Sequence, residues 1–420
     1  MNKVLIILNH QPTIPPFMLS AINCAKDRYD EVHYINTKYP IFSDKYAHIA
    51  NVHFHYPTKI DRYFAIFRSL FVFFNPLTLS NIWKCTKEKG FRVRYIKSFL
   101  VGLSADQCIR KLAEKLIVPH RGENITVLST WYSACALSAA LLKKKYKDIT
   151  ATSLAHSFEI LQSRNPLLRY EYIDFKHQHL DGIYFIADTM RKSYLDGIGE
   201  QPDNISKKLH VCYLGSYKKY PLLNISDPNI FNICTCSRVI PLKRLSLLLD
   251  ALKLWKEGPL RWTHMGDGPL LAELRTKAKI VMEDNPLVEI VFRGFVPNNE
   301  VEYYYAHNPV DIFVNLSNIE GIPISIMEAI SYGIPVIATD VGGTKEIVST
   351  AVGTLLSENI TPEIVYQALR DFFLSPLEIK LLLRESAYKS WQSKFNAVDN
   401  LNKLFDSIDQ LELNDAELCL

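Results

Sequence analysis

Short apolar runs alternate with longer amphipathic segments along most of the chain. Strand-length runs that are hydrophobic throughout, separated by helices with one apolar face, are typical of β-α-β units whose parallel strands are buried on both sides. The pattern therefore predicts an α/β fold with parallel sheets. The strands expected in the first half are Val4–Leu8, Val32–Ile35, Thr126–Ser129, Thr150–Ala155 and Ile183–Ala187. Those expected in the second half are Phe231–Cys236, Arg261–Met265, Val288–Phe292, Ile312–Leu316 and Pro335–Thr339.

Some segments between these runs show the spacing of apolar residues that is typical of a helix, and one has the composition of a linker. Turn-forming residues, among them Pro221, Pro228 and Asn229, cluster within residues 214–229 between two strand-like runs. Such a cluster indicates a linker, so we expect the boundary between two domains there. The clearest helix follows Arg244, where apolar residues recur at spacings of three and four: Leu245, Leu248, Leu249, Leu252 and Trp255.

Length and composition narrow the class of protein. The 420 residues suffice for two or three domains of ordinary size. With 48% hydrophobic and 22% charged residues, the chain has the composition of a soluble globular protein. Its net charge of +4 is too small to indicate nucleic-acid binding. The 8 cysteines are scattered without zinc-ligand spacing, and we expect them to be reduced, buried thiols.

Neither the N-terminal segment nor the most apolar stretch has the features of a signal peptide or a membrane-spanning helix. The first apolar run, Val4–Leu8, is too short for a signal peptide and is not followed by a small-residue cleavage site. The stretch from Tyr63 to Phe74 is interrupted by Arg68 and is shorter than the roughly 20 residues that span a bilayer. We therefore expect a cytoplasmic protein without a transmembrane helix.

The segment from Asp311 to Val348 carries the most informative chemistry. A strand is followed by Glu320, Gly321 and Pro323, and then by an apolar helix that contains Glu328. Glycine lets the backbone approach a ligand closely, and proline fits the first turn of a helix. The free amides of that turn are a natural seat for a phosphate, and a carboxylate within the helix can accept hydrogen bonds from ribose hydroxyls. Taken alone, two solvated glutamates would explain the same residues.

The order of elements in this segment resembles the glutamate–seven–glutamate motif of the family 4 retaining glycosyltransferases. Glu320 and Glu328 correspond to its two glutamates, and the sequence from Ser331 to Val348 continues the likeness. The resemblance implies that Gly321, Ile322, Pro323, Ile324 and Glu328 bind the donor nucleotide, with Glu328 at the ribose. It places Glu320 beside the transferred sugar.

Three further segments resemble the same family. Arg238 and Lys243 lie between a strand and a helix and look like its phosphate clamp, in which a guanidinium fork and an ammonium contact phosphate oxygens. Gly266 follows a strand within a Gly-x-Gly turn, and the segment Arg293, Gly294 and Phe295 resembles the loop that flanks the nucleobase. Considered alone, the cations would be solvated and the glycines would form an ordinary tight turn.

The N-terminal half matches less closely. Residues Ser129–Tyr132, followed by a helix of small residues, and Leu154–Glu159 resemble a polysaccharide-assembly branch of the family. The resemblance places His156, which follows a strand, opposite the donor sugar; a structural histidine is the alternative. Two departures stand out. Glu159 occupies a position that is usually aspartate, and Asn9–Thr13 replaces a glycine-rich loop, which leaves the contact made by that loop open.

The resemblance implies a GT-B fold, in which two doubly wound Rossmann-like domains face a central cleft. The N-terminal acceptor-side domain would comprise residues 1–215 and the donor-binding domain residues 216–390, with helices in 391–420 crossing back to the first domain. The implied reaction is transfer of a sugar, with retention, from a UDP- or GDP-sugar to a glycan acceptor. We expect no cofactor and no essential metal ion. The rival functions are a nucleotide-sugar epimerase and a non-catalytic glycan-binding relative.

The stretch from Lys59 to Lys97 predicts contact with a membrane surface. It mixes basic and aromatic residues and contains only two acidic ones, Asp61 and Glu88. A surface of this kind can lie on anionic lipid without spanning it. Together with the polysaccharide-assembly resemblance, it predicts a lipid-linked acceptor and a peripheral position at the inner face of the cytoplasmic membrane. Burial of these aromatic residues in a core is the alternative.

Overall fold

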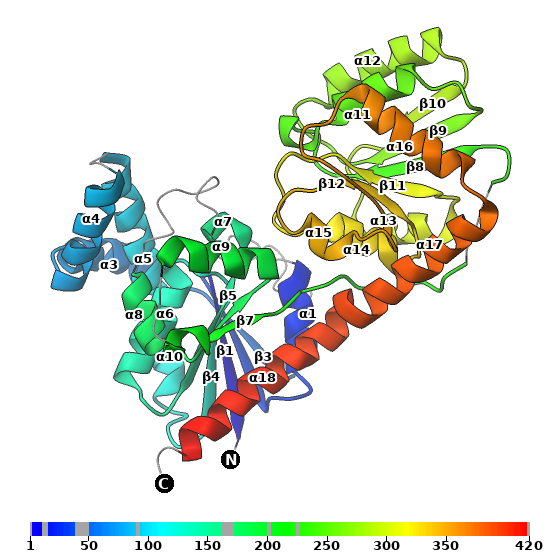
Figure 1. The fold of residues 1–420 in the computed structure, drawn as a ribbon. Coiled ribbons are helices and arrows are strands. Elements are labelled where there is room, and N and C mark those ends of the chain that lie inside the picture. The colour runs from blue at the N-terminus through cyan, green and yellow to red at the C-terminus, as the bar shows by residue number, and fades with distance from the viewer. Residues whose placement is uncertain are drawn as a thin grey trace. The chain divides into compact units, whose positions relative to one another are not determined.

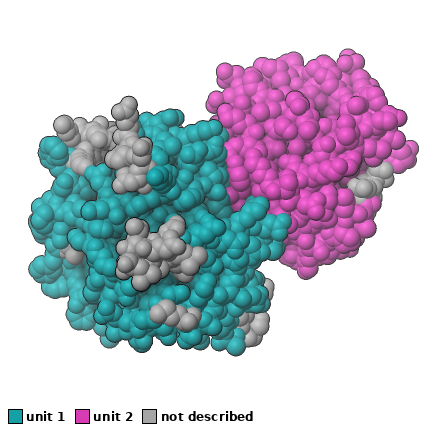
Figure 2. All heavy atoms as spheres, turned by 60° about the horizontal axis from the view of Figure 1, so that its bottom comes forward, with its two compact units in different colours: residues 1–212, 398–420 teal, residues 213–397 magenta. Residues whose placement is uncertain are grey.

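The computed structural model describes residues 2–10, 16–37, 50–89, 93–160, 172–199, 203–223 and 227–417. The chain divides into two compact units, coloured separately in Figure 2. Unit 1 comprises Met1–Cys212 and Val398–Leu420, and unit 2 comprises Tyr213–Ala397. Each unit is built around one parallel sheet. The α/β class is therefore confirmed in both halves of the chain, whereas the central cleft stays a prediction.

The sheet of unit 1 has seven strands in the order β3-β2-β1-β4-β5-β6-β7. Its central strand β1 is buried from Val4 onward, as expected for a strand covered by helices on both faces. The strands are β1 (Lys3–Asn9), β2 (Glu31–Asn36), β3 (Val52–His55), β4 (Asn124–Ser129), β5 (Thr150–Ala155), β6 (Gly182–Phe185) and β7 (Leu209–Val211).

Helices cover both faces of this sheet. In Figure 1, α5, α6 and α8 lie on one side of the sheet and α1 and α18 on the other. The C-terminal helix α18 is held there by an ion pair between Arg28 and Asp406 and by a hydrogen bond between Tyr184 and Ser407. The helices are α1 (Pro16–Ala25), α3 (Lys59–Phe73), α4 (Pro76–Lys89), α5 (Val93–Ile117), α6 (Ala134–Lys145), α7 (Ser157–Ile160), α8 (Ile173–His179), α9 (Asp188–Ile198), α10 (Asp203–Ser206) and α18 (Ala397–Glu417).

The sheet of unit 2 has six strands in the order β10-β9-β8-β11-β12-β13. One apolar core lies between the sheet and α11, α12 and α16, and a second lies on the other face against α13, α14 and η3. The strands are β8 (Phe231–Cys236), β9 (Leu260–Met265), β10 (Val288–Phe292), β11 (Ile312–Asn315), β12 (Val336–Thr339) and β13 (Gly353–Leu356). The helices are η2 (Pro241–Lys243), α11 (Leu245–Lys253), α12 (Leu271–Asp284), α13 (Asn298–His307), α14 (Ile324–Ser331), α15 (Thr344–Ile347), α16 (Pro362–Leu374), α17 (Leu377–Ser390) and η3 (Trp391–Phe395).

Both sheets contain one point where the direction of winding reverses. In unit 1 this switch point lies between β1 and β4, and in unit 2 it lies between β8 and β11. Ligands of open α/β sheets bind beyond the carboxyl ends of the strands at such points, because the following loops diverge to opposite faces. The topology therefore marks one candidate position in each unit.

Every strand expected from the sequence is present, and three further strands are not foreseen by the hydrophobic pattern. These are β3, β7 and β13, which are short and lie at the edges of the sheets. An edge strand needs less apolar sequence because only part of it is buried. The passage from unit 2 to unit 1 lies between Ala397 and Val398, because Trp391 and Phe395 still pack in the core of unit 2.

The cysteine side chains that the structure describes are free thiols, and most of them are buried. Cys85 and Cys419 lie outside the described side chains. Burial raises the pKa of the Cys212 and Cys236 thiols to about 12, which keeps both protonated. Among the described residues, the cysteines therefore behave as small apolar side chains.

Candidate functional site

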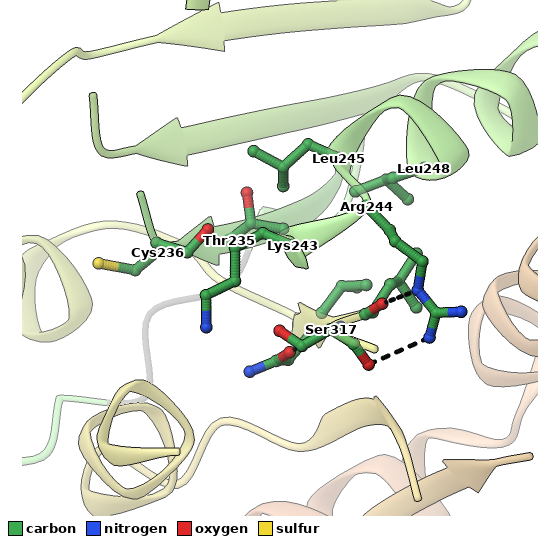
Figure 3. A pocket seen from close by; sticks show the side chains of 11 residues that line it. Thr235, Cys236, Lys243, Arg244, Leu245, Leu248 and Ser317 are labelled. Carbon is green, nitrogen blue, oxygen red and sulfur yellow. Dashed lines mark hydrogen bonds between the residues drawn. The ribbon is translucent and has the colours of Figure 1, made fainter. Parts of the chain in front are cut away.

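A pocket lies at the switch point of unit 2, at the carboxyl ends of β8 and β11 (Figure 3). Its walls come from the end of β8, from η2 and the start of α11, and from the end of β11. This is the position where an open parallel sheet holds its ligand. The lining residues are Thr235, Cys236, Ser237, Lys243, Arg244, Leu245, Leu248, Val314, Asn315, Leu316 and Ser317.

Lys243 and Glu320 form an ion pair at this pocket. Lys243 Nζ lies 2.5 Å from Glu320 Oε1, and the side-chain nitrogen Nδ2 of Asn315 lies 3.5 Å from the same oxygen. Both charged side chains are largely withdrawn from solvent, at 21% and 10% exposure. The two residues are 77 positions apart in the sequence, and the adjacency of β8 and β11 brings them together. The ammonium is therefore held in the pocket by a carboxylate.

Arg238 and Arg244 play different parts although both lie in the loop between β8 and α11. The Arg238 side chain is exposed and forms no hydrogen bond or ion pair with any residue that the structure describes. Arg244 adopts a left-handed backbone with φ of 47° and donates to the carbonyls of Leu316 and Ser317. Figure 3 shows its guanidinium turned toward Ser317 and away from the Lys243 amine. Arg244 therefore fixes the loops, and Arg238 remains available to a ligand.

Glycines allow the loops of the pocket to pack against one another. Gly266 has φ of 146°, and a Cβ on it would collide with the carbonyl oxygen of Ser237. Gly342 has φ of 55°, and a Cβ there would collide with the carbonyl oxygen of Glu320. Gly321 is buried, and its carbonyl accepts a hydrogen bond from the Gly343 amide at 2.6 Å. These glycines are required by close backbone contact, which holds Glu320 in place.

The helix after Glu320 begins one residue later than expected. Pro323 precedes α14 as its N-cap residue, and the first helical residue is Ile324. The expectation that Pro323 lies in the first turn is therefore wrong by one position, because its ψ of 103° is extended. Ile324 is exposed and Ile322 is half-buried. The first amides of α14 still precede the helical hydrogen bonds, so the helix keeps donors for an anion.

Glu328 lies on α14 and is partly buried. Its carboxylate accepts a hydrogen bond of 2.6 Å from the Asn298 side chain. Burial is the main cause that raises the pKa of Glu328 to about 7; the hydrogen bond from Asn298 acts in the opposite direction, and the nearby Glu302 acts in the same direction as burial. The carboxyl group therefore titrates near neutral pH. Asn298 was not foreseen from the sequence, because it lies in a separate helix, α13.

The loop after β10 presents one cation and one aromatic side chain. The Arg293 guanidinium lies 5.1 Å from the centre of the Tyr304 ring, a cation–π contact. Gly294 has φ of 69°, and Phe295 is 77% exposed. A phenylalanine so exposed beside a glycine turn offers a flat apolar face to a ligand. Gly294 also accepts a hydrogen bond from the Gly266 amide, so this loop adjoins the Gly266 turn.

The switch point of unit 1 is lined by aromatic side chains around His156. The Trp131 and Phe17 rings lie 4.4 and 5.1 Å from the His156 ring. His156 Nε2–H donates to the carbonyl of Thr130 at 3.0 Å, because a carbonyl can only accept. Burial lowers the pKa of His156 to about 4, so the ring is neutral and its Nδ1 is an acceptor.

Two unusual positions in this half also have structural partners. Glu159 accepts hydrogen bonds from the backbone amides of Tyr132 and His156, and burial raises its pKa to about 7. Asn9, at the start of the loop that lacks glycine, accepts from Thr130 and Trp131 at 3.1 Å. Residues 11–13 of this loop lie outside the described residues. Glu159 therefore positions the backbone that carries His156.

The basic and aromatic stretch after Lys59 forms an exposed surface, which we call the α3–α4 surface. Most of its described large apolar side chains project into solvent, and Tyr63 and Trp83 are 75% and 63% exposed. The alternative of a buried core is therefore wrong for these side chains. The residues from Lys84 to Lys97 lie outside the described side chains. The exposed apolar members are Ile60, Tyr63, Phe64, Ile66, Phe67, Leu70, Phe71, Phe74, Leu79 and Trp83.

Within the described residues, no single helix is long and apolar enough to cross a membrane. One bent pair, Lys59–Phe71 with Pro76–Trp83, reaches that length and composition when its two helices are taken together, with an angle of 69° between them. This pair coincides with the α3–α4 surface. Lys59, Arg62 and Arg68 are exposed on the same helix, so cations lie beside the apolar side chains.

Comparisons with known proteins point to one family. The family described as Glycosyl transferases group 1 matches residues 230–373. The O-antigen biosynthesis glycosyltransferase WbnH of Escherichia coli is 37% identical over 294 residues, which cover 68% of this chain and 80% of that protein. The amylovoran biosynthesis glycosyltransferase AmsK of Erwinia amylovora is 29% identical over 178 residues, 40% of this chain and 42% of AmsK. The chain thus matches less than half of the length of AmsK.

Among solved structures, the chain is similar to Anabaena Alr3699/HepE in complex with UDP. The TM-score is 0.68 at 14% identity, and the match covers 98% of this chain and 100% of that chain. At this identity the likeness bears on the fold alone. It confirms the expected fold class, a two-domain Rossmann-like α/β protein of the GT-B type.

Proposed function

The chain belongs to the group 1 glycosyltransferases, and we propose that it transfers a sugar from a nucleoside-diphosphate sugar to a glycan acceptor. The observation that carries this proposal is the pocket of unit 2, where Lys243 is held by Glu320 at the switch point. An ammonium withdrawn from solvent beside a helix N-terminus suits a diphosphate. The UDP-bound state of the structurally similar protein supports the same class of ligand.

The proposed donor contacts follow from the side chains around the pocket. Arg238 and Lys243 bind the diphosphate, aided by the first amides of α14. Glu328 binds the ribose hydroxyls, and the exposed ring of Phe295 stacks on the nucleobase in the loop that also holds Arg293. Each of these groups lies at or near a carboxyl end of the sheet of unit 2, which is the supporting observation.

The proposed reaction proceeds with retention at the anomeric carbon. The leaving group is a diphosphate, which needs no strong general acid, so catalysis rests on positioning and on positive charge near the departing oxygens. Arg238 and Lys243 supply that charge without a divalent metal ion. Glu320, which already pairs with Lys243, would lie beside the sugar. Undiminished turnover after exhaustive EDTA treatment tests the metal independence.

The proposed acceptor is a lipid-linked glycan in surface polysaccharide assembly. WbnH and AmsK, named for O-antigen and amylovoran biosynthesis, support this class of product. The α3–α4 surface supports a membrane-bound acceptor, because contiguous exposed apolar side chains beside Lys59, Arg62 and Arg68 suit an anionic lipid interface. We place the protein at the inner face of the cytoplasmic membrane.

Vesicle co-sedimentation tests the membrane part of this proposal. The protein should bind anionic vesicles more than neutral ones, and binding should fall as the salt concentration rises. Replacing Phe64, Phe67 and Phe71 by serine should release it. The matched control replaces Leu377, Leu381 and Leu382, which are equally exposed on α17 in unit 2, and should bind as the wild type does. Equal loss in both triple variants would contradict a role for the α3–α4 surface.

Product analysis separates this function from its rivals. Incubation with UDP- and GDP-sugars and a membrane lipid extract should release nucleoside diphosphate and move labelled sugar into the lipid fraction. An epimerase would instead convert the donor into an isomeric nucleotide sugar without any acceptor. A non-catalytic relative would bind the glycan and leave the donor unchanged. The presence of Arg238, Lys243, Glu320 and Glu328 in one unit favours the transferase.

A further inference from the structure

A cluster of histidines lies at one edge of the sheet of unit 1, away from the pocket described above. Strands β2 and β3 pair in parallel, with His33 opposite His53. Because alternate residues of a strand face the same side, Glu31 and His33 of β2 share a face with His53 and His55 of β3. His120, which follows α5, joins them: its ring lies 5.7 Å from the His33 ring.

Three of these side chains direct ligand atoms at one point. Glu31 Oε2 lies 3.0 Å from His33 Nε2 and 3.4 Å from His120 Nε2. The ligand atoms of Glu31, His33 and His120 all lie within 4.8 Å of one another. A tetrahedral site with metal–ligand bonds of 2.0–2.1 Å has ligand atoms about 3.3 Å apart. The spacing around Glu31 Oε2 is therefore that of a metal coordination sphere.

The hydrogen bonds behind the cluster determine which histidine nitrogen faces the glutamate. His120 Nδ1 lies 2.7 Å from the carbonyl oxygen of Leu116, and a carbonyl can only accept, so Nδ1 carries the proton. In the neutral ring, Nε2 then has a lone pair that faces the carboxylate oxygen of Glu31. Two acceptors at 3.4 Å repel each other unless a cation lies between them. A metal ion bound to both atoms would remove this repulsion.

His33 is supported in the same way from behind. Its Nδ1 lies 3.1 Å from His55 Nε2, and its Nε2 donates a hydrogen bond to Glu31 Oε2 at 3.0 Å. When a metal ion replaces that proton, His33 would donate from Nδ1 to His55 instead. Metal-bound histidines usually donate their second ring N–H to a fixed acceptor, which orients the ring.

We propose that Glu31, His33 and His120 bind a divalent transition-metal ion, with Zn²⁺ the best match to two imidazoles and one carboxylate. A water molecule or the exposed His53 would complete four ligands. Glu31 begins β2, so the site lies at the amino ends of the strands, whereas His156 follows the carboxyl end of β5. The ion is therefore a structural one: it ties the end of α5 to β2 and has no part in sugar transfer.

The test uses the full-length, untagged protein after dialysis against EDTA. Calorimetric titration at neutral pH should show one equivalent of Zn²⁺ bound, and Co²⁺ should give the visible absorption of a four-coordinate nitrogen and oxygen site. His120→Gln and Glu31→Gln should each weaken Zn²⁺ binding at least 100-fold. His55→Phe, which removes only the supporting hydrogen bond, should weaken it about 10–100-fold.

His307→Gln is the matched control, because His307 Nδ1 also bonds to a carbonyl four residues earlier, that of Tyr303, but faces no carboxylate. It should bind Zn²⁺ as the wild type does. The proposal is overturned if the wild type binds no ion. It is equally overturned if His120→Gln and Glu31→Gln bind normally, or if Co²⁺ absorption reports thiolate ligands. Unchanged thermal unfolding of the variants in EDTA would confirm that they fold.

Discussion

The switch points of unit 1 and unit 2 occupy equivalent positions in their sheets but are lined by different kinds of side chain. In unit 2 the position is charged, with Lys243 and Glu320 paired in a pocket and Arg238 exposed nearby. In unit 1 the rings of Trp131 and Phe17 enclose the imidazole of His156. Burial lowers the pKa of His156 to about 4, so no charge is added there.

This difference shows how one architecture can divide a reaction between two ligand chemistries. Fixed cations favour an anionic group such as a diphosphate, and they act most strongly when solvent is excluded. Aromatic faces and a neutral imidazole favour an uncharged, hydroxyl-bearing group such as a sugar. Substitutions in unit 2 should therefore weaken interactions with the diphosphate and the ribose of the donor. Those in unit 1 should lower turnover without changing nucleotide affinity.

The largest expected effect is that of Arg238→Ala. Because its guanidinium has no partner among the described residues, its removal should leave the fold unchanged. Loss of one preorganised charge contact typically lowers the rate about 10²–10³-fold, and we expect the same here for turnover. Steady-state kinetics measures it, with Arg275→Ala on α12 as an exposed arginine outside the pocket. Equal activity of the two variants would contradict the assignment of Arg238 to diphosphate binding.

Glu328→Ala should chiefly weaken nucleotide binding. If the carboxylate holds ribose hydroxyls, its loss should reduce the affinity for the free nucleoside diphosphate by about 1.5–3 kcal/mol. Calorimetry with the variant measures this loss, and Glu283→Ala, an exposed glutamate at the end of α12, serves as the control. Unchanged affinity in Glu328→Ala would contradict the ribose assignment and leave the position to Asn298 alone.

His156→Ala should have a smaller effect that falls on turnover. Its free Nδ1 can accept one hydroxyl hydrogen bond, and a bond of that kind contributes about 0.5–1.5 kcal/mol, or roughly tenfold at most. Nucleoside-diphosphate affinity should stay at the wild-type value, which is the measurement that distinguishes the two units. A variant with reduced thermal stability but normal turnover per folded molecule would instead assign His156 a structural part.

The smallest expected effect is a pH dependence of nucleotide affinity. Burial raises the pKa of Glu328 to about 7, and the ionised form accepts hydrogen bonds from ribose better than the neutral form. Affinity should therefore rise about threefold from about pH 6.5 to about 7.5 through this group. Glu328→Gln should remove this part of the rise while the titration of the nucleotide's own phosphate remains in both proteins. If the affinities of the wild type and Glu328→Gln changed with pH in parallel, this contribution of Glu328 would be contradicted.

The sequence predicted the central strands of both sheets because they are buried on both faces and read as continuous apolar runs. It did not predict the edge strand β3, whose sequence alternates histidine with apolar residues. The loops of unit 2 were recognisable because the ordered segment from Asp311 to Val348, which contains Glu320 and Glu328, resembles a family motif along its length. Close backbone contacts at glycines such as Gly266 and Gly342 restrict which residues those loops can contain.

Contacts between distant segments could not be predicted in the same way. The pairing of Lys243 with Glu320 depends on which strands are neighbours, and the hydrogen bond from Asn298 to Glu328 joins two helices. The histidine cluster depends on strand register and on where α5 ends, which brings His120 to His33. A regular spacing in the sequence marks only sites that are built from one segment.

The central claim is that the pocket of unit 2 binds the donor nucleotide. The most direct test measures by calorimetry how UDP, GDP and their sugar conjugates bind to the wild type, Glu328→Ala and His156→Ala. The account predicts that one nucleotide class binds the wild type at a single site, that Glu328→Ala binds it about 10–150-fold more weakly, and that His156→Ala binds it unchanged. Binding lost equally in both variants, or no binding of either nucleotide class to the wild type, would contradict a donor site in the pocket of unit 2.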